Sequence, residues 1–149
     1  MKLALASDHA GFELKQHLLG VVKTAGHDAA DLGALTVDPA DDYPDFAETL
    51  GRAVAKGDFE RGILICGSGV GAAVAANKIK GVRAGLCHDS YSAHQGVEHD
   101  DMNVLVFGSR VIGPALAEDL VRVFLAAKFT GEPRHLRRLQ KVKAIEARG

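Results

Sequence analysis

The 149-residue sequence has only two cysteines, no long apolar run and almost no net charge. Two thiols in a chain of this length do not form a disulfide scaffold, which favours the reducing cytoplasm as its location. No apolar run approaches the roughly 20 residues that a membrane span needs. A formal net charge of -1 argues against a general nucleic-acid binder. We therefore expect neither nucleic acid nor a membrane as a partner.

Hydrophobic residues make up 47% of the chain, which is enough for a sizeable core, and the length suits one domain at residues 1–149. Apolar runs predict five strands, at residues 2–6, 27–32, 62–66, 82–87 and 103–107. Apolar residues at helical spacing predict helices at about residues 12–26, 43–57, 72–80, 90–98, 114–125 and 134–147. This alternation predicts a three-layer, Rossmann-like α/β fold, in which helices cover both faces of a five-stranded parallel sheet.

The stretch from Gly62 to Gly71 joins a buried strand to a tight turn with three glycines at alternate positions. Such a turn directs backbone N–H groups and the positive end of a helix dipole toward one spot. Cys66 lies beside that spot, where a thiol ionises more readily. The stretch therefore offers a base or nucleophile next to an anion-stabilising cradle. The alternative is a tight connection around an inert core thiol.

Polar side chains follow four of the five predicted strands. Because the carboxyl ends of parallel strands meet at one edge, where ligands bind in open α/β sheets, we expect these groups to converge. The pairs concerned are Asp8 and His9, Cys66 and Ser68, His88 and Asp89, and Ser109 and Arg110.

Residues 67–72 also fit the pattern G-x-G-x-x-A of a dinucleotide-binding turn, and Asp89 lies 22 residues after Gly67. This reading makes the chain a non-catalytic nucleotide-binding module. Two observations oppose it. The pattern follows the third strand rather than the first, and the remaining length leaves little room for a catalytic domain.

A metal site near His94 and His99 is the next alternative, since their spacing loosely fits paired ligands. Cys87 and His88 are adjacent and do not easily share one ion, so we expect no metal. His99 also precedes the fifth strand, at the edge opposite the glycine turn. It can reach that turn only if its helix is short or bends back.

The last predicted helix carries Arg134 and Arg138 four residues apart, on one face. Guanidinium pairs bind phosphate well, although such a face can also be merely solvated. The helix has its own apolar stripe and lies beyond the last crossover. This makes it a candidate for packing on a neighbouring subunit.

Several motifs in this order resemble ribose-5-phosphate isomerase type B, a family grouped with the galactose-6-phosphate and allose-6-phosphate isomerases. The resemblance covers nearly the whole chain. The segments that carry it are Asp8-His9-Ala10-Gly11-Phe12, Tyr43-Pro44, Ile65-Cys66-Gly67-Ser68-Gly69-Val70-Gly71, Ala75-Ala76-Asn77-Lys78, Asn103-Val104-Leu105 and Gly108-Ser109-Arg110.

The resemblance implies interconversion of ribose 5-phosphate and ribulose 5-phosphate through an enediolate, without a metal or organic cofactor. Galactose or allose 6-phosphate, or a four-carbon sugar phosphate, is the alternative substrate. In the catalytic roles that it implies, Cys66 is the base that moves a proton between C1 and C2, Ser68 polarises that base, His99 opens the sugar ring, and Asp8 assists there or holds a sugar hydroxyl.

The resemblance also implies binding roles and a homodimer or tetramer whose active sites take groups from both chains. One departure from the family is Asp100, where many relatives carry an amide beside the ring-opening histidine. An extra carboxylate there could alter sugar preference or simply point to solvent. The implied enediolate cradle is Gly67, Gly69, Val70 and Gly71, the implied sugar contacts are Tyr43 and Asn103, and the implied phosphate contacts are His9, Arg110, Arg134 and Arg138.

Overall fold

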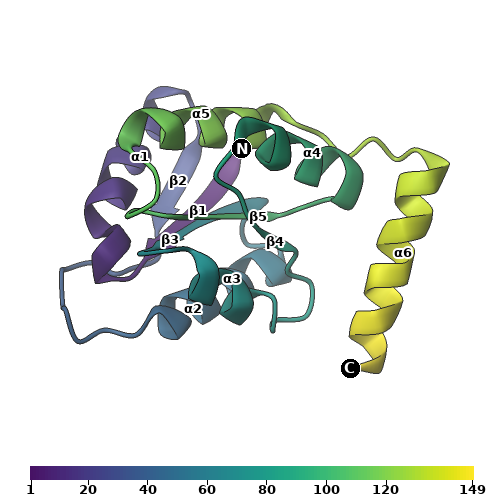
Figure 1. Ribbon diagram of the computed structural model, residues 1–149, viewed down its shortest axis with the longest axis horizontal. Coiled ribbons are helices and arrows are strands. Elements are labelled where there is room, and N and C mark those ends of the chain that lie inside the picture. The colour runs from purple at the N-terminus through teal and green to yellow at the C-terminus, as the bar shows by residue number, and fades with distance from the viewer.

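A computed structural model describes residues 1–149, which form a five-stranded parallel sheet with helices on both faces (Figure 1). This confirms the predicted fold class. The strand order is β2-β1-β3-β5-β4. The strands are β1 (Lys2–Ser7), β2 (Asp28–Asp31), β3 (Arg61–Cys66), β4 (Ala84–Leu86) and β5 (Val104–Gly108).

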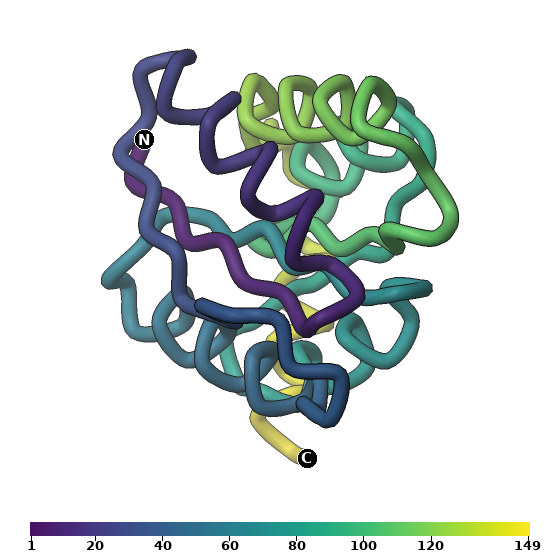
Figure 2. The backbone as a smooth tube through the Cα atoms, turned by 90° about the vertical axis from the view of Figure 1, so that its left-hand side faces the viewer, coloured from purple at the N-terminus to yellow at the C-terminus, as the bar shows by residue number.

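Two layers of helices enclose the sheet (Figure 2), and a last helix lies outside them (Figure 1). A short 3-10 turn, η1 (His9–Gly11), links β1 to the first helix. No helix of the structure combines the length and the apolarity that a membrane crossing requires. One face carries α1 (Phe12–Thr24), α4 (Ser90–Asp100) and α5 (Pro114–Ala126), the other carries α2 (Tyr43–Lys56) and α3 (Val70–Ala76), and the outer helix is α6 (Pro133–Arg148).

The central strands are apolar except at a few terminal positions (Lys2, Ser7 and Arg61), because both of their faces are buried. In β3, Ile63 and Ile65 pack under α1 and α5, whereas Leu64 and Cys66 pack under α2 and α3. Alternate side chains of a strand point to opposite faces, so a strand covered on both sides reads as a continuous apolar run. The alternation also places the Cys66 thiol on the α2 and α3 side of the sheet.

Helix α3 and strand β4 differ most from the bounds that the sequence predicts. Helix α3 ends at Ala76 rather than near Lys80, and β4 covers residues 84–86 rather than 82–87. The Asn77 side chain accepts a hydrogen bond from the Ala84 N–H at 2.8 Å and donates one to the Ala84 carbonyl at 2.9 Å. This side chain ends the helix by pairing with the next strand, a long-range contact that apolar spacing does not reveal.

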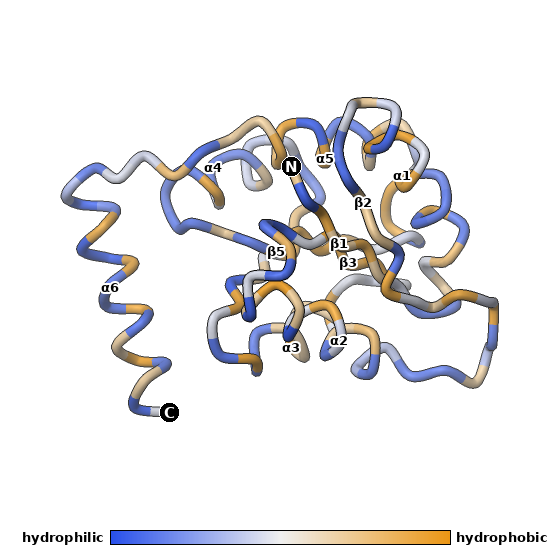
Figure 3. The backbone as a smooth tube through the Cα atoms, turned by 180° about the vertical axis from the view of Figure 1, so that it is seen from behind, coloured by the Kyte–Doolittle hydropathy of each residue, from blue (hydrophilic) through white to orange (hydrophobic).

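Helix α6 stands away from the rest of the chain (Figures 1 and 3). Only His135 and Leu139 of this helix are buried, and Glu146 accepts a hydrogen bond from the Gly81 N–H at 2.8 Å near its far end. The helix therefore leaves apolar side chains in solvent, namely Leu136, Val142 and Ile145.

A fully buried lysine fixes the start of the loop that leads from β2 to α2. The Lys15 ammonium donates to the Asp31 carboxylate at 2.8 Å and to the Ala34 carbonyl. Burial alone would raise the pKa of Asp31, but hydrogen bonds, first from Lys15 and then from the Gly33 N–H, bring that pKa below its ordinary value of 3.8. The ion pair therefore anchors residues 33–34 to helix α1.

Replacing Lys15 with methionine should lower the free energy of unfolding by about 3 kcal/mol, because it leaves a partly buried carboxylate and a buried carbonyl without their donor. Chemical denaturation at pH 7 measures the change. The control is Lys23→Met, an exposed position on the same helix, which should change stability by less than about 0.5 kcal/mol. Equal effects of the two substitutions would contradict this role for Lys15.

The destabilisation should also depend on pH. A carboxylate whose pKa is depressed by folding contributes stability above its unfolded pKa, and that contribution is lost as pH falls through the folded value. The stability difference between the wild type and Lys15→Met should therefore shrink below about pH 4, where Asp31 becomes protonated.

Candidate active site

The strand order creates a crevice at the carboxyl ends of β1 and β3. Strand β1 pairs with β2 on one side and with β3 on the other, so the connections leave it in opposite directions. Ligands of open α/β sheets bind at such a switch point. The segments that meet there are Asp8-His9, which follows β1, and the glycine turn, which follows β3.

A cleft of about 340 Å³ lies at this edge. It brings together side chains from β1, α2, β3 and the segment after β5, as the sequence predicted for most of them. Its lining residues are Asp8, Tyr43, Cys66, Gly67, Ser68, Gly71, Arg110 and Val111.

The glycine turn brings a backbone N–H group to the Cys66 sulfur. The Gly69 N–H donates to Sγ at 3.1 Å, and the Val70 N–H donates to the Ser68 hydroxyl at 3.2 Å. Gly69 has a φ of +81°, which favours glycine, and a Cβ there would come within 2.8 Å of the Phe107 backbone. The buried thiol thus lies beside an amide donor, and the Ser68 side chain is exposed toward the cleft.

Arg110 reaches the cleft because the segment after β5 is joined to the glycine turn. The Ser109 N–H donates to the Cys66 carbonyl at 2.9 Å, and the Arg110 N–H donates to the Gly67 carbonyl at 3.0 Å. The guanidinium lies over Gly67, where an added Cβ would be 3.4 Å from Nη1. An exposed cationic side chain therefore lines the same cleft as the thiol.

Tyr43 covers the opposite side of the turn. A Cβ on Gly71 would come within 2.5 Å of the Tyr43 ring, so the ring packs directly on the glycine backbone. Tyr43 is the first residue of α2, where Pro44 suits the first helical turn. Its side chain is partly exposed, which leaves the aromatic group available at the rim of the cleft.

Asp8 and His9 form the β1 side of the site. The buried Asp8 carboxylate accepts hydrogen bonds from the Ala10 and Gly11 N–H groups at 3.0 and 3.2 Å, and both bonds use Oδ1. The His9 ring contacts Asp41, with 2.6 Å between Nδ1 and Oδ1. This hydrogen bond raises the pKa of His9 above its ordinary 6.5. Sequence reasoning missed Asp41, which carries no signal to distinguish it among the acidic residues of loop 33–42.

The ligand atoms of Asp8, His9 and Asp41 lie within 4.8 Å of one another. Hydrogen bonds within the protein account for where these side chains lie. Asp8 caps η1, and Asp41 contacts both the backbone and the ring of His9. We therefore interpret the cluster as a hydrogen-bonded pair beside a capping carboxylate and do not assign a metal to it.

His99 does not join Cys66 in the same cleft. It lies near the end of α4, before β5, whereas the cleft lies after β5, and the five residues of that strand separate the two edges by about 15 Å. The His99 ring stacks on buried His135 of α6 with 4.0 Å between centroids, and Gln95 contacts its Nδ1 at 2.9 Å.

The other predicted binding residues near this second location are also remote from Cys66. Asn103 uses its side chain to bond the Arg83 N–H at 2.7 Å and the Gly81 carbonyl at 2.9 Å. Asp100 is exposed at the end of α4. Arg134 and Arg138 are exposed on α6. A single chain therefore holds two separate groups of the predicted site residues.

The polar groups after β4 serve the fold. The Gly108 N–H donates to His88 Nε2 at 2.9 Å, and Asp89 caps α4 by accepting from the Ser92 N–H at 2.7 Å. Burial raises the pKa of the Cys87 thiol to about 11, which keeps it protonated at neutral pH. His94 pairs with Glu98 at 2.8 Å on one face of α4.

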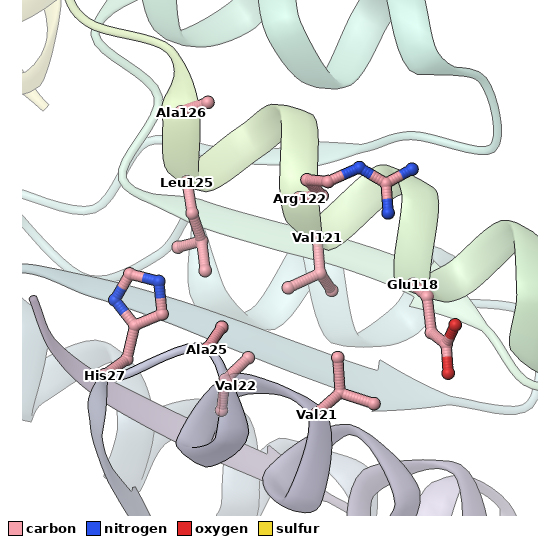
Figure 4. Close-up of a pocket in the computed structure, with 9 residues that line it drawn as sticks. All are labelled: Val21, Val22, Ala25, His27, Glu118, Val121, Arg122, Leu125 and Ala126. Carbon is pink, nitrogen blue, oxygen red and sulfur yellow. The ribbon is translucent and has the colours of Figure 1, made fainter.

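Another cavity, of about 390 Å³, lies between α1 and α5 (Figure 4) and shares no lining residue with the cleft at the glycine turn. Its lining is mostly apolar, with Val22, Val121 and Leu125 among the side chains, and His27 lies at one end. It contains none of the predicted site residues.

Comparison with known proteins matches residues 3–142 to the family Ribose/Galactose Isomerase. The chain is 43% identical over 147 residues to ribose-5-phosphate isomerase B of Escherichia coli, which covers 99% of this chain and 97% of that protein. It is also 37% identical over 134 residues to D-erythrulose-4-phosphate isomerase of Pectobacterium atrosepticum, which covers 88% of this chain and 86% of that protein.

Solved structures agree over the full length of the chain. Ribose-5-phosphate isomerase B of Clostridium thermocellum superposes with a TM-score of 0.96 at 42% identity, covering 99% of both chains. The Mycoplasma genitalium enzyme, solved with bound ribulose-5-phosphate, has a TM-score of 0.94 at 41% identity, covering 99% of this chain and 97% of that one. The fold, the glycine turn with its thiol and these matches together place the chain in the ribose/galactose isomerase family of sugar-phosphate isomerases.

Proposed function

We propose that this protein interconverts ribose 5-phosphate and ribulose 5-phosphate, with Cys66 as the base. The observation that carries the proposal is the Cys66 sulfur, 3.1 Å from the Gly69 N–H, in a cleft that also contains Tyr43 and Arg110. Its relatives of about 40% identity are named for this isomerisation, and one was solved with ribulose-5-phosphate. Family membership favours an enzyme over a nucleotide-binding module.

In this proposal the Cys66 thiolate takes the proton from C2 of the open-chain aldose. The electrons of the C–H bond form the C1–C2 double bond, and negative charge develops on O1. Amide groups of the glycine turn stabilise that oxyanion, at about 3 kcal/mol per donor. The proton returns to C1, the hydroxyl proton moves from O2 to O1, and the ketose results. Ser68 polarises the base, and Asp8 holds a sugar hydroxyl.

In this proposal both chains of a homodimer supply the phosphate-binding residues and the ring-opening histidine of each site. Two such dimers can pair further into a tetramer. Arg110 lines the Cys66 cleft and His9 follows Asp8 beside it, whereas His99, Arg134 and Arg138 lie elsewhere in the same chain. A second copy would bring its own α4 and α6 to the cleft. The exposed apolar side chains of α6 support this, since an unpartnered apolar stripe is typical of an interface.

A four-carbon sugar phosphate is the second candidate substrate. The identity to D-erythrulose-4-phosphate isomerase, 37%, is only slightly lower than that to the ribose-5-phosphate enzymes. Asp100 is the residue that departs from the expected amide. In the proposed dimer Asp100 would lie near the sugar. A carboxylate only accepts hydrogen bonds from sugar hydroxyls, whereas an amide both accepts and donates them.

A panel of four-, five- and six-carbon aldose phosphates tests the substrate directly. We expect the highest kcat/KM on ribose 5-phosphate, with no loss in the presence of a metal chelator. A preference for the four-carbon sugar would replace the pentose assignment but keep the mechanism. No turnover of any of these sugar phosphates would refute the proposed activity.

Replacing Cys66 with alanine should lower kcat by at least about a hundredfold, because proton transfer loses its base. The control is Cys87→Ala, which removes the other free and buried cysteine of the chain. Cys87→Ala should keep kcat close to that of the wild type. Circular dichroism should show both variants folded. An active Cys66→Ala enzyme would disprove the assignment.

Mixing two inactive variants tests whether the site is shared. Cys66→Ala and His99→Asn should each be nearly inactive as pure proteins. After denaturation and refolding together in equal amounts, half of the dimers are mixed and one of their two sites is intact, so about a quarter of the wild-type activity should return.

The matched control for this mixing is His99→Asn refolded with the Cys66→Ala/His99→Asn double variant, which can form no intact site. Light scattering should give a mass of twice the 15.7 kDa chain. A monomer, or activity that never exceeds that of the control mixture, would refute the shared site.

A further inference from the structure

The acidic loop between β2 and α2 brings the Asp41 carboxylate into contact with His9. Asp41 lies in a turn in which its N–H donates to the Asp38 carbonyl at 3.0 Å, while the Asp38 side chain accepts from the Ala40 N–H at 3.0 Å. Asp41 Oδ1 lies 3.1 Å from the His9 backbone nitrogen and 2.6 Å from Nδ1. Both the backbone and the ring of His9 are thus bound to one oxygen.

This contact fixes which ring nitrogen carries the proton. A carboxylate only accepts hydrogen bonds, so Nδ1 must be the donor. In a neutral His9 the single ring proton would then lie on Nδ1, and Nε2 would present a lone pair. A lone pair repels a phosphate oxygen. His9 can therefore donate to phosphate through Nε2 only when the ring is a cation.

The burial of Asp41 favours the same cation. Its side chain is only 10% exposed, and Oδ2 is buried without a hydrogen-bond partner. A buried carboxylate oxygen without a donor is unfavourable unless positive charge lies nearby. The imidazolium of His9 is the charge in contact with this group. The pair is therefore more stable with the ring protonated.

The other charged groups facing His9 act in opposite directions. Asp8 favours the protonated ring and raises the pKa of His9, whereas Arg110 opposes it. Arg110 and a protonated His9 thus place two cationic groups at one edge of the cleft. Two neighbouring cations repel each other in the empty site, and an anion with two charges removes that repulsion. A phosphate dianion is the group that fits.

We propose that Asp41 is a positioning residue that holds His9 as an imidazolium, with Nε2–H as the donor to the substrate phosphate. The proposal rests on the proposed function, because it takes a sugar phosphate as the substrate. Asp41 acts only through His9, so it should affect binding more than the proton-transfer step. Its effect should also be confined to the pH range in which the ring would otherwise lose its proton.

The test compares Asp41→Asn with the wild type in steady-state kinetics from pH 6 to pH 8.5. The asparagine keeps the size of the side chain but removes the charge. The ratio of the two KM values should be near one at pH 6 and about ten at pH 8, with kcat little changed. Taking the ratio at each pH cancels the pH effects that the two proteins share.

Asp42→Asn is the matched control, since this exposed neighbour makes no side-chain bond to the helix that it precedes. It should keep the wild-type KM at every pH. Asp41→Glu, which restores the charge on a longer side chain, should recover part of the affinity. A merely structural role for the loop would instead change KM by the same factor at all pH values.

NMR titration of the His9 ring, assigned with a His9→Asn variant, measures protonation without turnover. Asp41→Asn should bring the pKa of His9 down toward 6.5, whereas Asp42→Asn should not. An unchanged pKa in Asp41→Asn would overturn the proposal, and so would a lowered pKa with a KM ratio that stays flat.

Inorganic phosphate separates this proposal from the proposed function. If the wild type acts on no sugar phosphate, the proposed function is refuted. The His9 resonances can still be followed as inorganic phosphate is added at pH 7.5. A phosphate-dependent shift that Asp41→Asn abolishes would support the pairing. A shift of the same size in both proteins would overturn it.

Discussion

The close approach of two backbone segments, the glycine turn after β3 and the end of β5, determines where the cleft forms. Gly108 has no room for a side chain, because a Cβ there would lie 2.5 Å from the Ser68 carbonyl carbon. Only this closeness allows the Ser109 and Arg110 N–H groups to reach the carbonyls of Cys66 and Gly67. Main-chain bonds therefore hold the backbone of Cys66 and Arg110 in place, and side-chain substitutions elsewhere disturb such bonds little.

The opposite wall of the cleft depends on a different kind of interaction. There the buried Lys15 anchors residues 33–34, and the following loop carries Asp41 to His9. Charge pairing supports this wall, whereas backbone packing supports the other. The wall with Asp8 and His9 is consequently the one that responds to pH, and the wall with Cys66 is the one that tolerates least change in shape.

The sequence was sufficient for the fold class, the five strands and the convergence of Asp8, Cys66 and Arg110, because strand burial and strand ends leave local signals. It was not sufficient for the end of α3, which the pairing of Asn77 with Ala84 decides. The contact of Asp41 with His9 could not be predicted either, because the two residues are 32 positions apart in the sequence. The role of His99 came from resemblance and that of Arg134 from helical spacing as well, and their contact with substrate stays a prediction.

Helix α6 joins the rest of the chain through few buried residues and carries much of its apolar surface outward. In the proposed dimer such a helix would gain most of its stability from the second copy, so its order would depend on the protein concentration. Activity per molecule would then fall on dilution, well before the sheet itself unfolds. The amount of the protein in a cell would thereby set its specific activity, without any separate regulator.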